Sequence, residues 1–173
     1  MSKENILLKE INKSAKTLHH HGIENGRQEI IWYLDILNIV NKNKIYTYFE
    51  SQISPKIKQA INIFIKERSN SKPFQYIVNQ GTFYGRTFYV NSQVLIPRPE
   101  TEIILDILKD KHYANALEIG TGSGVISVTL SLENIAQSIL ATDISTGALN
   151  VAKKNILKFS CKNIKFQLLK IIH

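Results

Sequence analysis

The first seventy residues of the chain repeat their hydrophobic positions at helical spacing. The repeat predicts one helix over residues 3–23 and a second over residues 26–40. A third helix is expected to begin after Ser54, because a hydroxyl side chain followed by Pro55 is a typical helix start, and to fade at Arg68. Amphipathic helices in series predict a small helical bundle.

Single residues add detail to this bundle. Gly22 is expected to end the first helix, because glycine readily adopts the backbone conformation of a helix C-terminus. Trp32 and Tyr33 stand beside aliphatic residues of the second repeat and are assigned to the core. The apolar and aromatic run from Ile45 to Phe49 predicts a short turn or helix.

After Pro73 the pattern changes from helical spacing to short apolar and aromatic runs. Residues 82–84 and 87–90 are such runs, and Gly85 and Arg86 stand between them. A two-residue connection that begins with glycine suits a type II′ turn. The sequence therefore predicts a β-hairpin.

Residues 94–102 read Val-Leu-Ile-Pro-Arg-Pro-Glu-Thr-Glu. The two prolines hold Arg98 in an extended segment, because proline disfavours helix in the residue before it. Glu102 is expected in the first turn of a following helix, whose predicted apolar face consists of Ile103, Ile104, Ile107 and Leu108. On physical grounds alone, this segment is a rigid linker with a charged helix start.

The centre of the pattern is a strand, a turn and a helix. The apolar run 116–119 predicts a buried strand, and residues 125–132 have helical spacing. Between them lie Gly120, Gly122 and Gly124, whose missing β-carbons and free amides would let a polar or anionic ligand approach closely. A tight turn without a ligand is the alternative, but glycine at every second position exceeds what a turn needs. The pattern favours a nucleotide- or cofactor-binding corner.

A second strand, residues 138–143, ends in the carboxylate of Asp143. Asp143 follows the glycine turn by about twenty residues, the offset at which an acid binds ribose hydroxyls in a βαβ unit. The alternative is a solvated Asp143 that caps the next helix. A helix around residues 149–159 and a third strand over residues 164–169 follow, so the fold class is α/β.

Composition narrows the choice of compartment and partner. The chain has 173 residues, of which 43% are hydrophobic, and carries a formal net charge of +8 from scattered lysines, a weak hint of an anionic partner. A single cysteine, Cys161, fits the reducing cytoplasm. No signal peptide or membrane span is apparent, and the run of His19, His20 and His21 is expected at a solvated helix end rather than at a metal.

Two resemblances to known families follow from the motifs. Glu118 before the Gly-x-Gly-x-Gly turn resembles the first motif of class I S-adenosylmethionine methyltransferases, whereas a dinucleotide fingerprint would have glycine or alanine at Val125. Residues 73–77, 83–85 and 94–102 resemble the signature segments of HemK-type peptide chain release factor glutamine methyltransferases.

The second resemblance implies a function. Such enzymes methylate the glutamine side-chain amide in the Gly-Gly-Gln motif of class I release factors, with S-adenosylmethionine as methyl donor. By position, the cofactor-binding residues would be Glu118, Gly120, Thr121, Gly122, Ser123, Gly124 and Asp143, with Arg98, Pro99, Glu100 and Thr101 closing over the site. No metal site is expected.

The resemblance also implies an organisation. Residues 1–72 would form a helical substrate-docking domain, residues 73–97 a β-hairpin linker, and residues 98–173 the first part of a Rossmann-like S-adenosylmethionine-binding domain. The partners would be class I release factors, without direct need of nucleic acid or membrane, and the protein is expected to be a cytoplasmic monomer.

The sequence departs from the family pattern in two places. Asn79 stands where the family usually has glycine, and no Asn-Pro dipeptide occurs in the chain, so the family's Asn-Pro-Pro-Tyr catalytic motif is missing. The residues after Ala116 supply only three strands, because a βαβ unit takes about 30 residues or more. We therefore expect a C-terminally truncated chain without catalytic residues, whose glycine-motif strand is an exposed edge.

Two alternatives remain open at this point. The first is a non-catalytic fragment or binding module that docks a release factor. The second is a nicotinamide-dependent oxidoreductase, against which Val125 and the Pro-Arg-Pro-Glu segment argue.

Overall fold

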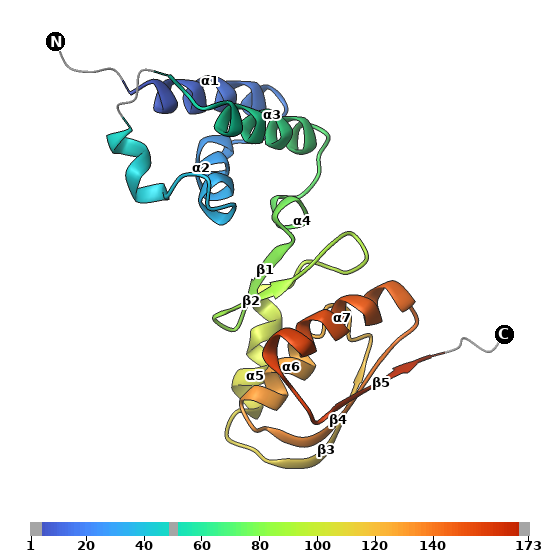
Figure 1. Ribbon diagram of the computed structural model, residues 1–173. Coiled ribbons are helices and arrows are strands. Elements are labelled where there is room, and N and C mark those ends of the chain that lie inside the picture. Colours follow the sequence, from blue (N-terminus) through green and yellow to red (C-terminus); the bar gives the residue numbers. More distant parts are fainter. Residues whose placement is uncertain (1–4, 49–51, 170–173) are drawn as a thin grey trace. The chain divides into compact units, whose positions relative to one another are not determined.

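A computed structural model describes residues 5–48 and 52–169 (Figure 1). The chain divides into two compact units, Met1–Val78 and Asn79–His173, and each is described by itself. Phe49 of the predicted short helix and residues 170–173 lie outside the described residues.

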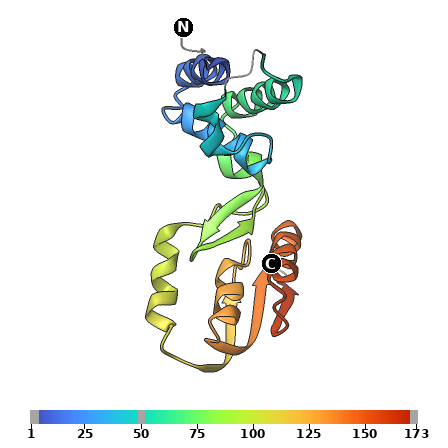
Figure 2. The same cartoon turned by 60° about the vertical axis from the view of Figure 1, so that its left-hand side comes forward.

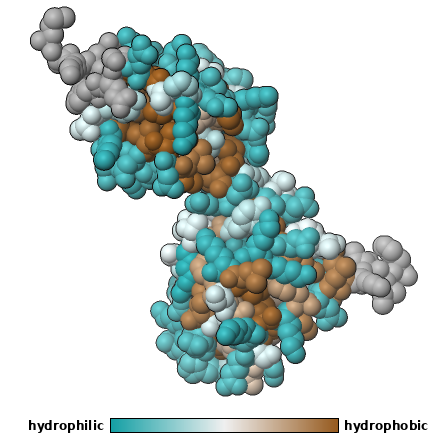
Figure 3. Space-filling view, viewed as in Figure 1, coloured by the Kyte–Doolittle hydropathy of each residue, from teal (hydrophilic) through white to brown (hydrophobic). Residues whose placement is uncertain are grey.

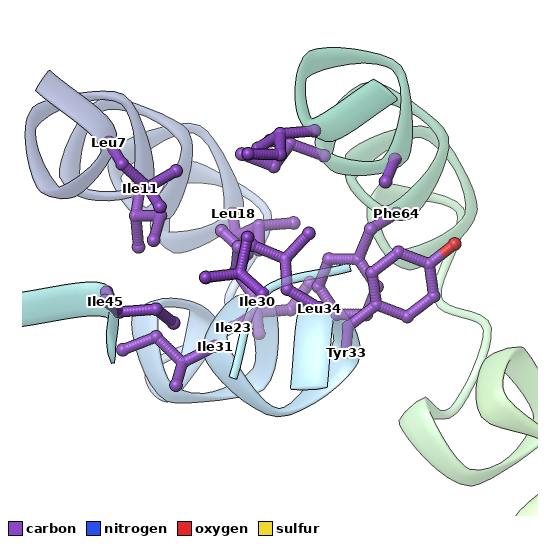
Figure 4. Close-up of a cluster of buried hydrophobic side chains, with 14 residues drawn as sticks. Leu7, Ile11, Leu18, Ile23, Ile30, Ile31, Tyr33, Leu34, Ile45 and Phe64 are labelled. Carbon is purple, nitrogen blue, oxygen red and sulfur yellow. The ribbon is translucent and has the colours of Figure 1, made fainter. Parts of the chain in front are cut away.

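Unit 1 is the predicted helical bundle. Its elements are α1 (Ile6–His20), α2 (Gly26–Ile36), the 3₁₀ helix η1 (Lys42–Thr47), α3 (Pro55–Ser69) and α4 (Phe74–Val78). Fully buried side chains from the three longer helices meet in one cluster, among them Leu18, Leu34 and Phe64 (Figure 4). The hydrophobic spacing therefore predicted the correct core.

The ends of these helices follow local chemistry. The Ser54 hydroxyl accepts a hydrogen bond from the Ile57 N–H at 3.3 Å, as expected of an N-cap. Gly22 follows α1 with a φ of 75°, which confirms its predicted place at the helix end. The second helix is shorter than predicted and ends at Ile36, because Asn38 turns to a φ of 53°.

The assignment of Trp32 to the core is wrong. Its side chain is 44% exposed, whereas Tyr33 is buried as predicted. The Trp32 ring meets the Phe74 ring edge-on at a centroid distance of 6.1 Å. Trp32 and Tyr33 are neighbours on one helix, so they point in different directions and only one of them can face the core.

Unit 2 begins with the predicted hairpin, formed by β1 (Gln80–Phe83) and β2 (Arg86–Tyr89). Its turn is one residue earlier than predicted, at Tyr84 and Gly85. Both have positive φ angles, 48° and 70°, which is typical of a type I′ turn rather than type II′. The Tyr84 N–H donates to Glu102 Oε1 at 2.8 Å, so a carboxylate supports this strained residue.

A parallel three-stranded sheet with helices on one face makes up the rest of unit 2 (Figures 1 and 2). The sheet order is β3 (Tyr113–Ile119), β4 (Ala136–Asp143) and β5 (Ile164–Leu168); the helices are η2 (Pro99–Thr101), α5 (Glu102–Leu108), α6 (Val125–Leu132) and α7 (Thr146–Phe159). The predicted α/β class is confirmed. Phe83 and Phe88 of the hairpin belong to the same core as α5, α6 and β4.

The glycine-motif strand β3 is not buried. It lies at the edge of the three-stranded sheet, as the strand count predicted, and Ile119 is 73% exposed. Leu117 is also exposed, whereas Glu118, which alternates with them, is partly buried. The prediction of a buried strand fails because apolar composition does not show whether a sheet has neighbours on both faces.

Helix α5 likewise differs from its predicted packing. Its fully buried residue is Leu105, whereas Ile103, Ile104 and Ile107 of the predicted apolar face are exposed. Apolar residues also reach the visible surface of the unit that contains the sheet (Figure 3).

One ion pair in unit 1 should matter for its stability. The Arg68 guanidinium binds both Glu29 carboxylate oxygens, at 2.7 and 3.1 Å, and the two side chains are mostly buried. We expect Glu29→Gln to lower the unfolding free energy of unit 1 by about 2–4 kcal/mol, because Arg68 would keep a buried charge without its partner. Trp32, the sole tryptophan, reports this unfolding by fluorescence.

The matched control is Glu67→Gln, which breaks the more exposed pair of Glu67 with Lys72. This variant should leave the Trp32 transition almost unchanged, because solvent screens exposed pairs. Equal effects of the two substitutions would contradict the prediction.

Candidate cofactor-binding site

A pocket of about 150 Å³ lies at the carboxyl end of β3. Its lining residues are Leu95, Ile96, Pro97, Arg98, Thr101, Glu118, Gly120, Thr121, Gly122, Ser123, Val125 and Ile126. The segment between β2 and α5 thus faces the glycine turn across this pocket. The volume is below the range of about 300–1,000 Å³ for ligand pockets, so these residues would enclose only part of a cofactor.

The three glycines serve two different purposes. Gly120, Gly122 and Gly124 have φ angles of 77°, 56° and 78°, a conformation that other residues rarely adopt. A β-carbon on Gly120 or Gly122 would meet nothing within 4 Å, so the space in front of them is open. A β-carbon on Gly124 would lie 3.1 Å from that of Ala152, so this glycine allows α7 to approach.

Glu118 braces the glycine turn against the first turn of α6. Its Oε2 accepts hydrogen bonds from the Thr121 hydroxyl at 2.8 Å and from the Ser127 N–H at 3.1 Å, and it also contacts the Ser127 hydroxyl. A carboxylate of the chain itself therefore occupies the position at a helix N-terminus that favours an anion. The same contacts fix the path of the turn.

The electrostatics of Glu118 follow from its surroundings. Burial raises the pKa of its carboxyl group above the ordinary value of 4.5, and the negative charge of Asp143 acts in the same direction. The hydrogen bonds from Ser127 and Thr121 favour the charged form and oppose this shift of the pKa.

Asp143 is buried at the end of β4 and holds the turn from the other side. Its Oδ2 accepts from the Gly122 N–H and its Oδ1 from the Ser145 N–H, both at 2.9 Å. The N-cap of α7 is Ser145, whose hydroxyl accepts from the Ala148 N–H at 3.2 Å. Capping of the next helix, the alternative role for Asp143, therefore belongs to Ser145.

The Pro-Arg-Pro-Glu segment contributes part of one pocket wall. Arg98 and Thr101 line the pocket, whereas Pro99 and Glu100 are exposed and are not among its lining residues. The structure thus brings Arg98 and Thr101 together with Glu118 and the turn from Gly120 to Ser123.

Sequence reasoning missed two residues that shape the site. Ser127 contacts Glu118 through both its N–H and its hydroxyl. Asn155 is fully buried on α7 and donates to the Ser123 carbonyl at 2.8 Å. The signal that could have revealed Asn155 is a polar residue on the apolar face that contains Ala152 and Ile156.

Within residues 5–48 and 52–169, no three His, Cys, Asp or Glu side chains gather closely enough to hold a metal ion. The same part of the chain contains no helix of the length and apolarity that a membrane span requires.

Known proteins with similar sequences are methyltransferases. Residues 99–172 match the family of ribosomal protein L11 methyltransferases (PrmA). A protein of Leptospira interrogans named release factor glutamine methyltransferase is 37% identical to this chain, over 91% of this chain and 57% of its own length. A protein of the same name from Bacillus subtilis is 34% identical, over 92% of this chain and 58% of its own length. One from Bacillus cereus is 36% identical over 76% of this chain and 50% of its own length. The chain spans about half the length of these relatives, and the similarity confirms the resemblance predicted from its motifs.

The raised pKa of the partly buried Glu118 predicts that the stability of unit 2 depends on pH. Because the pKa of Glu118 is raised in the folded chain, the folded chain keeps a proton that the unfolded chain has already lost as pH rises above 4.5. The unfolding free energy of unit 2 should therefore fall with rising pH in this window, and Glu118→Gln should remove that part of the slope.

The measurement is urea unfolding followed by circular dichroism at several pH values from 4.5 upward, with Trp32 fluorescence reporting on unit 1. A stability difference between the wild type and Glu118→Gln that stays constant with pH would contradict the prediction.

Proposed function

Since the chain is related in sequence to release factor glutamine methyltransferases, we propose that it provides the S-adenosylmethionine-binding corner of such an enzyme. The proposed reaction transfers a methyl group from the cofactor to the side-chain amide nitrogen of the glutamine in the Gly-Gly-Gln motif of class I release factors. The methyl group is activated by the sulfonium of the cofactor, so the protein mainly supplies positioning.

The observation that carries the choice of cofactor is the pair of carboxylates at the turn. Glu118 already accepts a hydrogen bond from the Ser127 N–H at the α6 N-terminus, and Asp143 lies on the other side of the turn. A pyrophosphate at the α6 N-terminus would meet the Glu118 carboxylate and be repelled, whereas a ligand with a sulfonium and an ammonium group would be attracted by both carboxylates. This charge pattern favours S-adenosylmethionine over a nicotinamide dinucleotide.

The turn also offers the polar groups that such a ligand needs. The N–H groups of Ser123, Val125 and Ile126 have no hydrogen-bond partner in the described part of the chain. Each Asp143 oxygen accepts one N–H, and a carboxylate has about four lone-pair positions in all, so Asp143 keeps acceptor capacity for ribose hydroxyls. Asp143 does not line the pocket, so this contact would form beside it. Gly120 leaves the open space that lets a ligand come close to the turn.

The segment across the pocket completes the proposed site. Arg98 offers a cation that can pair with the carboxylate of the amino-acid part of the cofactor, and Thr101 a hydroxyl. Pro99 and Glu100 would act only by holding these two in place, because they do not line the pocket.

The proposed partners and compartment follow from the reaction. The substrate is a class I release factor, docked by the helical unit, and the protein acts as a cytoplasmic monomer. A second candidate is a docking module without catalysis, which the absence of an Asn-Pro dipeptide from the sequence favours for this chain taken alone.

Cofactor binding should depend on Asp143. We expect Asp143→Asn to weaken binding of S-adenosylmethionine at least about tenfold, because the amide can accept at only one atom and its NH₂ group would face the N–H of either Gly122 or Ser145. Calorimetric titration measures the dissociation constant. Asp110→Asn removes the same charge at an exposed position of unit 2 and should leave the affinity unchanged. Undiminished binding by Asp143→Asn would refute this role.

We expect this chain to keep cofactor binding but to lack catalysis. We expect the purified 173-residue chain to bind S-adenosylmethionine but not to transfer its methyl group, because the family's Asn-Pro-Pro-Tyr motif is missing. The assay follows tritiated methyl transfer to a release factor with its Gly-Gly-Gln motif, with a Bacillus subtilis relative as positive control. Transfer by the chain alone would contradict the prediction, and capture of the release factor without transfer would support the docking module.

A further inference from the structure

Both the oxygen and the nitrogen of the Asn155 side-chain amide have hydrogen-bond partners inside unit 2. Its Oδ1 accepts from the Tyr89 N–H at 2.7 Å, and its Nδ2 donates to the Tyr89 carbonyl at 2.9 Å and to the Ser123 carbonyl at 2.8 Å. The residue is fully buried. The amide thus pairs with β2 as a further strand would, and its second N–H donates to the glycine turn.

One partner of Asn155, Ser123, lines the pocket, and the other, Tyr89, lies at the start of the segment that leads to the opposite wall. Ser123 is part of the glycine turn. Tyr89 ends β2 and is followed within a few residues by Leu95, the first residue of the other wall. Between them, Val90 and Val94 are buried, so the connection from Tyr89 to the wall is anchored in the core.

Helix α7 touches both walls at further points. Ala152, one turn before Asn155, packs closely on Gly124, where a β-carbon would lie 3.1 Å from that of Ala152. Near the start of the helix, Gly147 lies against Gln93, where a β-carbon would approach the Gln93 side-chain oxygen to 2.3 Å. The helix is therefore a common support for the turn and for the segment that leads to Leu95.

We propose that Asn155 is a positioning residue, which sets the separation of the two pocket walls by joining Tyr89 to Ser123 through one rigid amide. This inference rests on the proposed function, because the pocket is taken to hold S-adenosylmethionine. Asn155→Ala would leave the Tyr89 N–H and the carbonyls of Tyr89 and Ser123 without these partners, so the two walls should move apart to reach water.

The test compares two asparagines of the same unit. Asn155→Ala removes the link between the walls, whereas Asn163→Ala removes bonds to the Ala136 carbonyl and the Ser131 hydroxyl, at the other end of β4. Both variants should unfold more easily. Only Asn155→Ala should weaken S-adenosylmethionine binding, at least about tenfold, while Asn163→Ala stays within about twofold.

The variant Asn155→Asp distinguishes the effect of lost hydrogen bonds from the effect of lost packing. It keeps the shape of the side chain and the acceptor for the Tyr89 N–H but cannot donate to either carbonyl. We expect it to lose affinity as Asn155→Ala does, and it carries the test if Asn155→Ala does not fold. Wild-type affinity in Asn155→Asp, or an equal loss of affinity in Asn163→Ala, would overturn the proposal.

Hydrogen exchange supplies a readout that needs no ligand. In Asn155→Ala and Asn155→Asp, amides of residues 94–101 and 120–127 should exchange faster, whereas in Asn163→Ala these two segments should keep wild-type rates. If the wild type does not bind S-adenosylmethionine, the proposed function fails but exchange still decides the role of Asn155. Unchanged exchange in both segments would refute the link between the walls.

Discussion

The glycine turn depends on one interaction, the contact of the Glu118 carboxylate with the beginning of α6. The carboxylate accepts hydrogen bonds from the Ser127 N–H and the Thr121 hydroxyl, and these bonds fix the path of the turn. They also satisfy an N–H group at the helix N-terminus that would otherwise be available to an anion. Asp143 repeats this device from β4 by accepting from the Gly122 N–H. Two acids hold the turn, and the proposed choice of ligand rests on their charge.

The hairpin of β1 and β2 packs against the elements that carry this turn. Phe83 and Phe88 are buried in the same core as α6 and β4, and the strand β2 meets α7 through Asn155. The segment that follows β2 then returns as the second wall of the pocket. The site is thus built from parts distant in sequence, which one helix, α7, supports together.

Local chemistry was predictable from the sequence, but the surroundings of each element were not. The Ser54 cap, the end of α1 at Gly22 and the strand-turn-helix corner depend on neighbouring residues and are confirmed. The predictions that failed concern exposure. Ile107 and Ile119 are apolar residues on regular elements, and no local pattern shows whether another layer covers them.

We propose that the turn recognises S-adenosylmethionine because Glu118 and Asp143 make it negative. Titration of the isotopically labelled chain with S-adenosylmethionine and, separately, with NAD⁺ tests it most directly, through the backbone amide signals of residues 120–126. We expect S-adenosylmethionine to shift these signals and NAD⁺ to leave them in place. Shifts caused by NAD⁺, or an unchanged turn in the presence of S-adenosylmethionine, would contradict it.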